Sequence, residues 1–151
     1  MSSLKHYIRI VESESIKIVK VFHGTRDSDL KLRSAPLYGV VEEEFAMSYA
    51  LERSHGHDQA FVYTIEFRFR KLASDKDVGD LCDELDIFVF PSTAGVITEH
   101  PELIEMLQKR GFDGVFAYDF DFEDKEREVY CVFNAARQAR ILSCDRLSKR
   151  S

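Results

Sequence analysis

The chain has no tryptophan and no long hydrophobic run. Its longest apolar stretches, such as Ile87 to Phe90, are far shorter than the about 20 residues that a membrane helix needs. Charged residues interrupt the N-terminal stretch before an apolar segment forms, so no signal peptide is expected. These absences predict a cytoplasmic chain without a membrane contact.

Cysteine is scarce, and the cysteines present lack the spacing of a metal site. Cys82, Cys131 and Cys144 are odd in number and form no C-x-x-C pair, which predicts a reducing compartment and no structural zinc. His55 and His57 lie in a polar loop without a third ligand at a useful spacing. We therefore expect a protein that works without a metal.

The chain also lacks an excess of positive charge. Its formal charge of −6 works against a broad nucleic-acid-binding surface, although it allows a local basic patch. Arg68, Arg70 and Lys71, at the end of one predicted strand, are a possible contact for an acidic partner. With 151 residues, 44% of them hydrophobic, the sequence predicts a single globular domain over 1–151.

Hydrophobic periodicity predicts short strands and helices without a regular strand–helix–strand alternation. This irregular order favours an α+β fold with largely antiparallel sheets. The predicted elements are an N-terminal helical extension over 1–15, strands over 16–22, 60–70, 87–90, 115–118, 128–133 and 140–142, helices opening at 42 and 101, a short helix within 75–85, a small-residue loop over 92–98, an acidic loop over 119–125 and a loose tail over 143–151.

The most informative stretch is the predicted strand that ends in His23-Gly24-Thr25. An imidazole, a residue without a Cβ and a hydroxyl follow one another at a strand end, where a ligand can approach the backbone at Gly24. Read alone, the stretch is more typical of a strand followed by a turn, with His23 a satisfied, partly buried histidine.

Two further sequence motifs complete a pattern that begins at His23. Tyr38 precedes a predicted helix that carries Tyr49, and Glu128 opens a late strand after a Gly-Phe-Asp-Gly segment. In this order and spacing the chain resembles the ADP-ribosyltransferase superfamily, in the His-Tyr-Glu branch of the poly(ADP-ribose) polymerases and diphtheria toxin. The resemblance implies a fold of two mainly antiparallel sheets with flanking helices.

The resemblance also implies an activity. NAD⁺ is the expected co-substrate, and a single ADP-ribose is transferred to a macromolecule, most simply a protein, with a nucleic-acid acceptor as a second option. His23 and Thr25 are expected to contact the NAD⁺ riboses, Gly24 the carboxamide, and Tyr38 and Tyr49 the nicotinamide ring.

Glu128 is expected to stabilise the oxocarbenium-like charge that develops on the ribose. Glu126-Arg127-Glu128 also spells the Glu-x-Glu of the arginine-modifying branch, which implies that Glu126 orients the acceptor. The late block has one residue more between Glu128 and Phe133 than the family spacing, so a β-bulge is needed to direct Glu128 to the ribose.

Other functions stay open at this point. An RNA 2′-phosphotransferase also uses NAD⁺ and a His-Gly-Thr start, but the further His and Arg residues that it needs for phosphate have no matching set here. A catalytically silent NAD-binding or interaction domain of the same fold is the third option. An NAD dehydrogenase is disfavoured, because no G-x-G-x-x-G follows a strand.

Overall fold

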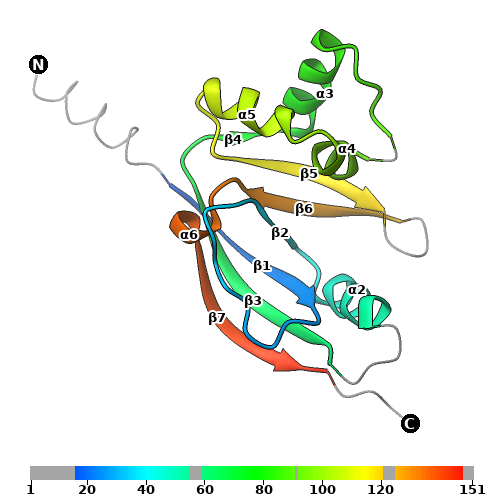
Figure 1. Ribbon diagram of the computed structural model, residues 1–151, viewed down its shortest axis with the longest axis vertical. Helices are drawn as coiled ribbons and strands as arrows, with labels where there is room; N and C mark the ends of the chain where they lie inside the picture. Colours follow the sequence, from blue (N-terminus) through cyan, green and yellow to red (C-terminus); the bar gives the residue numbers. More distant parts are fainter. Residues whose placement is uncertain (1–15, 55–58, 91, 121–124, 148–151) are drawn as a thin grey trace, which may run out of the picture.

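The computed structural model describes residues 16–54, 59–90, 92–120 and 125–147 (Figure 1). The predicted N-terminal helix lies outside the described residues. So does the loop that contains His55 and His57, together with the centre of the predicted acidic loop and the last residues of the predicted tail.

Seven strands form one mixed sheet in the order β4-β5-β6-β2-β1-β3-β7. The described strand pairs are antiparallel apart from β4 with β5, which is parallel. The α+β class is confirmed, but one continuous sheet stands where two were predicted. The strands are β1 (Lys17–Thr25), β2 (Leu37–Val40), β3 (Phe61–Phe69), β4 (Leu72–Ala73), β5 (Gly114–Phe120), β6 (Glu126–Val132) and β7 (Ala139–Arg146).

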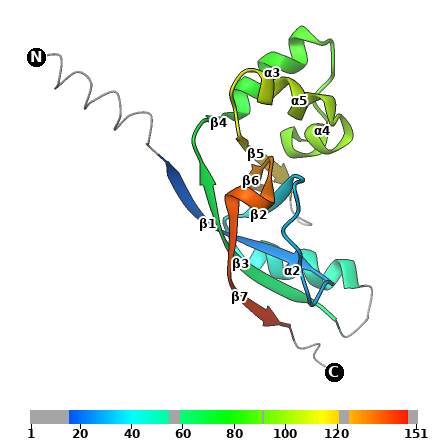
Figure 2. The ribbon, with the colours of Figure 1, turned by 60° about the vertical axis from the view of Figure 1, so that its left-hand side comes forward.

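The sheet has a weak joint between β1 and β2. These strands share one registered pair, Phe22 with Val40, whereas β1 and β3 pair continuously from Lys17–Phe69 to Thr25–Phe61. Figures 1 and 2 show the β4-β5-β6 part with α3, α4 and α5 on one side of this joint, and β1, β3 and β7 with α2 on the other. The two parts of the sheet are therefore connected by side-chain contacts rather than by a continuous ladder of backbone hydrogen bonds.

Local side-chain and backbone chemistry marks both the starts and the ends of the described helices. Ser74 and Asp77 form a capping box at the start of α3, and the Ser92 hydroxyl caps α4 by accepting from Gly95 N. Gly111, with φ of 91°, follows α5 in the left-handed conformation that favours glycine. The helices are α2 (Glu43–Ser54), α3 (Asp75–Glu84), α4 (Thr93–Glu99), α5 (Glu102–Lys109) and α6 (Ala135–Gln138). None of the described helices has the length and apolar content to cross a bilayer.

Each part of the sheet has its own buried core. One core packs helices α3, α4 and α5 on one face of β5 and β6 through residues that include Leu81, Ile97, Leu103, Val115 and Cys131. The other lies against β1, β3 and β6 through residues that include Val21, Ile65, Phe67, Phe69 and Tyr130. The two cores lie on opposite faces of β6, because Tyr130 and Cys131 are neighbours in one strand.

Three predicted elements are corrected by the structure. Residues 87–90 form no strand, because Phe88 and Phe90 are 82% and 67% exposed and lie between α3 and α4 away from any strand edge. Residues 93–99 are helix α4 rather than loop, since Ser92 caps them. β7 continues to Arg146, so residues 143–146 pair with β3 instead of forming a loose tail.

Candidate functional site

A pocket of about 340 Å³ lies at the joint between β1 and β2. Helix α2 and helix α4 approach it from the two parts of the molecule, and Figure 1 shows them on either side of the end of β2. Its volume is at the lower end of the about 300–1,000 Å³ of small-molecule sites. The lining residues that carry chemistry are His23, Gly24, Tyr38, Tyr49, Thr98 and Asp119.

The side chain of His23 spans the joint. Its Nδ1 lies 2.8 Å from the carbonyl oxygen of Tyr38. Burial lowers the pKa of His23 below its ordinary value, and the contact with the Tyr38 carbonyl only partly offsets this. The ring is therefore neutral at pH 7, with Nδ1–H donating to the carbonyl and Nε2 left as an acceptor for a ligand hydroxyl.

The ring of Tyr38 connects β2 with α4. The Thr98 hydroxyl donates to the Tyr38 phenol oxygen at 3.2 Å, and burial raises the pKa of Tyr38. The phenol thus stays protonated at any physiological pH. Its side chain lies on the same face of the sheet as Cys131, its partner on β6, and packs against the core beneath α4.

Gly24 is required by packing rather than by a ligand. A Cβ at this position would lie 2.1 Å from the carbonyl oxygen of Ala46 in α2. The room that the sequence led us to assign to a ligand is therefore filled by the helix. Because Gly24 lets α2 approach β1 closely, it brings the helix face with Phe45, Ala46 and Tyr49 to the pocket.

Tyr49 lines the pocket from α2 and is 40% exposed. Phe45 lies one helical turn earlier and is 8% exposed. The buried ring anchors the helix, and the exposed ring has a surface on which a planar ligand can stack.

Thr25 does not line the pocket. Its Oγ1 accepts a hydrogen bond of 3.1 Å from the backbone N–H of Asp27, in the turn that follows β1. Of the five residues predicted to bind NAD⁺, the structure brings four together, namely His23, Gly24, Tyr38 and Tyr49, and assigns Thr25 to the turn.

The two predicted catalytic glutamates are not brought into the pocket. β6 pairs in regular register, with Val129 opposite Val40 and Glu128 opposite Tyr118, and the bulge expected at Glu128 is absent from the described strand. Alternation along the strand then turns Val129 to the pocket and turns Glu126 and Glu128 to the other face.

Among the described residues, Asp119 is the one carboxylate that lines the pocket, and the sequence predicts it in a loop. It belongs to β5, where its Oδ1 accepts from the Ser92 hydroxyl at 3.0 Å and from the N–H of Phe120 at 2.9 Å. Its charge contributes to the raised pKa of Tyr38, so the two groups are near each other. If the predicted strand over 115–118 is extended by one residue, Asp119 falls on the same face as Ala117. The alternation of this strand could therefore have predicted the position of Asp119.

Among the described residues, no group of three or more His, Cys, Asp or Glu side chains is arranged to hold a metal ion. Comparisons with known proteins give no match: no protein-family model, no curated protein and no solved structure is significantly similar to this chain.

Proposed function

We propose that this chain binds NAD⁺ by its nicotinamide end and transfers ADP-ribose to a macromolecular acceptor, in the first instance a protein. The observation that supports the proposal is the meeting of His23, Gly24, Tyr38 and Tyr49 in one pocket. These residues come from three different elements, β1, β2 and α2.

The charge of the pocket suits the nicotinamide of NAD⁺. Since His23 is neutral, Asp119 is the one charged side chain among the described residues of the lining. A negative, largely apolar pocket favours a planar ring that carries positive charge. The volume of about 340 Å³ fits that ring with its ribose, so the adenosine half would lie outside.

The same charge argues against the RNA 2′-phosphotransferase alternative. A site for a ribose 2′-phosphate needs cationic or N–H donors that match a phosphate. No lysine or arginine is among the lining residues that the structure describes. A phosphate placed beside Asp119 would be repelled.

Asp119, rather than Glu128, is the carboxylate that can serve the transfer. Cleavage of the bond between nicotinamide and ribose develops positive charge on the ribose, and a fixed carboxylate lowers the energy of that state more than that of bound NAD⁺. Two hydrogen bonds to Oδ1 hold the Asp119 carboxylate in place. His23 Nε2 can accept a hydrogen bond from a ribose hydroxyl and so orient the sugar.

One observation favours a second candidate, a domain that binds NAD⁺ without reacting it. Val129 occupies the position of β6 that faces the pocket, where a glutamate would be needed if catalysis followed the expected role of Glu128. The two candidates share the binding step and differ in whether ADP-ribose leaves the pocket.

Calorimetry with NAD⁺ in excess chelator tests the binding step. We expect saturable binding to one site without added metal, and affinity that requires Mg²⁺ or Zn²⁺ would contradict the proposal. Incubation with NAD⁺ labelled in its ADP-ribose part and cell lysate then separates the candidates. Label on protein supports transfer, whereas binding without labelled protein, labelled nucleic acid or released ADP-ribose supports the silent domain.

A further inference from the structure

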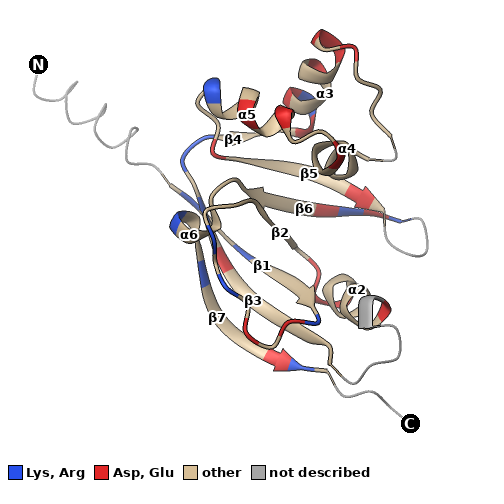
Figure 3. Ribbon diagram, viewed as in Figure 1, with Lys and Arg blue, Asp and Glu red and all other residues tan. Residues whose placement is uncertain are grey.

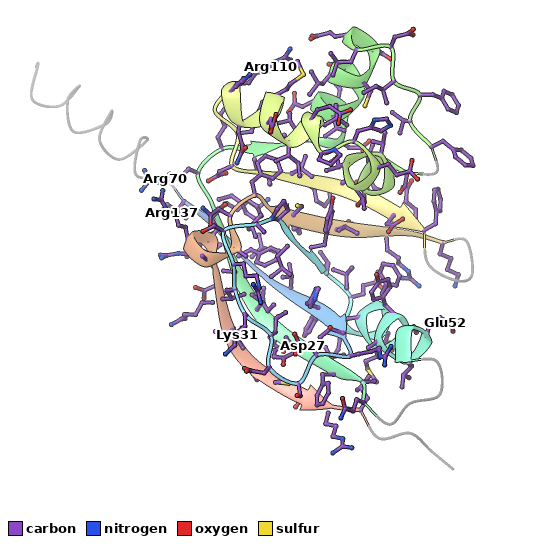
Figure 4. The ribbon with its side chains drawn as sticks, in the orientation of Figure 1. Asp27, Lys31, Glu52, Arg70, Arg110 and Arg137 are labelled. Carbon is purple, nitrogen blue, oxygen red and sulfur yellow. The ribbon has the colours of Figure 1, made fainter. Side chains whose placement is uncertain are left out.

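Four arginines line two adjoining hollows at the end of the sheet away from the pocket. Arg68 is on β3, Arg70 directly follows its last residue, Arg137 is on α6, and Arg140 is on β7. The hollows measure about 500 Å³ and 390 Å³ and share Arg68, Arg137 and Gln138, so they form one continuous surface, the arginine groove. Figure 4 shows Arg70 and Arg137 together at one end of β3, with Glu52 of α2 at the opposite side.

Arg68 extends from the face of β3 that is turned away from the core, because its neighbours Phe67 and Phe69 are buried. Arg70 follows the last residue of β3 and is exposed. Arg140 adjoins them, because it pairs with Glu66 across β3 and β7. Figure 3 shows blue segments at this end of β3 and on α6 and β7, while the red acidic segments are scattered over other elements, among them α2, α3 and α5.

The carboxylates of the groove are already engaged. Asp113 accepts backbone N–H groups, from Arg70 at 2.7 Å and from Lys71 at 3.1 Å. Glu66 lies 3.4 Å from Arg140. Arg68, Arg70 and Arg137 have no ion pair with any described residue. In a chain of formal charge −6, the groove therefore presents three guanidinium groups without an ion pair among the described residues, beside one carboxylate, Asp113, that is held by backbone N–H groups.

Asn134 adds a polar group with unused capacity to the first hollow. Its Oδ1 is buried and has no hydrogen-bond partner among the described residues. Because Oδ1 is the buried atom of the amide, the NH₂ group is the part that can donate to an anion in the hollow.

We propose that the arginine groove binds a run of phosphate groups, the chemistry that a single-stranded nucleic acid and a free polyphosphate share. Guanidinium groups pair with phosphate through two parallel N–H···O bonds. Arg68 and Arg137 reach the same hollow from different elements, and the tetrahedral oxygens of one phosphate can accept from both. The row of arginines along β3 and β7 fits several phosphates better than one.

This site is independent of the NAD⁺ proposal, because the groove and the pocket share no lining residue. Either can be present without the other. Binding at the groove is also expected in the presence of saturating NAD⁺.

The test uses the full chain and two probes, a labelled single-stranded RNA of about ten nucleotides, a length within the usual range of site sizes, and inorganic tripolyphosphate. The groove variant is Arg68→Ala with Arg137→Ala. The matched control, Lys31→Ala with Arg146→Ala, removes the same charge from exposed positions outside the groove. All four positions are exposed, and thermal unfolding checks that each variant folds.

We expect the groove variant to bind at least about tenfold more weakly, while the control stays within about twofold. Loss of two phosphate contacts should also flatten the plot of log affinity against log salt by about 1.4. Arg68→Lys with Arg137→Lys keeps the charge but loses the paired bonds, and it should fall between the two. Binding of RNA alone identifies nucleic acid as the source, and binding of tripolyphosphate alone identifies a free polyphosphate.

Three results would overturn the inference. They are the binding of neither probe, equal weakening by the groove variant and its control, and tighter binding of a glutamate-rich peptide of equal charge than of either phosphate probe. The last result would identify the groove as a contact for an acidic protein.

Discussion

The Nδ1 atom of His23 lies 2.8 Å from the carbonyl oxygen of Tyr38, across the joint at which β1 and β2 separate. A side-chain hydrogen bond thus connects β1 and β2 beside Phe22 and Val40, the one residue pair that is in register between these strands. The same bond leaves Nε2 of His23 as an acceptor beside the pocket. The architecture of the sheet and the chemistry of the site therefore depend on one imidazole.

Replacement of His23 by glutamine should make the stability less dependent on pH. Burial lowers the pKa of His23 in the folded protein below its unfolded value of 6.5. Its contribution to stability is therefore complete above that pH and is lost as the pH falls through the folded pKa. Urea unfolding at about pH 7.5 and about pH 5.5 should show a larger fall in the free energy of unfolding for the wild type than for His23→Gln. At neutral pH the variant should be less stable by about 1 kcal/mol. Equal falls in the two proteins would mean that His23 is not buried as a neutral ring.

Replacement of Gly24 by alanine should destabilise the protein through helix α2. The new Cβ would meet the Ala46 carbonyl at 2.1 Å, and backbone must move to make room. We expect a loss of about 1–3 kcal/mol, the usual cost of overpacking. Gly79→Ala is the matched control, because nothing lies within 4 Å of its added Cβ in helix α3. The control should gain about 0.5–1 kcal/mol. A Gly24→Ala protein as stable as wild type would contradict the close approach of α2.

Tyr49 should contribute to NAD⁺ binding through its ring. Tyr49→Ala is expected to weaken binding by about 1–3 kcal/mol, and Tyr49→Phe should change it little, because the stacking face remains. Phe88→Ala serves as the control, since this ring is 82% exposed and lies outside the pocket. Calorimetric titration of the variants with NAD⁺ measures the effect. Equal losses for Phe and Ala at position 49 would show that the hydroxyl, rather than the ring face, binds the ligand.

The three cysteines should differ in reactivity. Burial raises the pKa of Cys131 to about 12 and also raises the pKa of Cys82, whereas Cys144 is exposed on β7. Because the thiolate is the reacting species, a disulfide reagent at about pH 8 should titrate one thiol of the folded protein rapidly and all of them in denaturant. Cys144→Ser should remove the rapid phase. A rapid phase that persists in this variant would show that a buried cysteine becomes accessible.

Local pattern was enough to predict much of the pocket. His23, Gly24, Tyr38 and Tyr49 were recognised by order and spacing, and the strand and helix that carry them follow from clear periodicity. The long β3 strand alternates so regularly that its buried face, from Phe61 to Phe69, could be read directly. The capped helix before Gly111 was equally clear, because Pro101 and Gly111 mark its ends.

Other features of the fold depend on tertiary contacts that the local sequence pattern does not encode. Whether Glu128 or Val129 faces the pocket depends on one residue of register in β6, and only the pairing with β2 and β5 fixes it. Residues 87–90 alternate like a strand but pair with no described strand. Ile87 and Val89 pack against the core, and Phe88 and Phe90 are exposed. The single sheet arises from one pair at the joint, Phe22 with Val40, which no local signal encodes.

Asp119→Asn and Glu128→Gln, compared in one assay of ADP-ribosyl transfer and NAD⁺ hydrolysis, test the central claim most directly. Asp119 lines the pocket and Glu128 faces away from it, so each variant removes one carboxylate from an otherwise identical chain. We predict that Asp119→Asn still binds NAD⁺ in calorimetry but loses about 10²–10³-fold in both activities, as expected for loss of a preorganised electrostatic contact. The Glu128→Gln variant should retain both the transfer and the hydrolysis activity. An inactive Glu128→Gln protein beside an active Asp119→Asn protein would contradict the account.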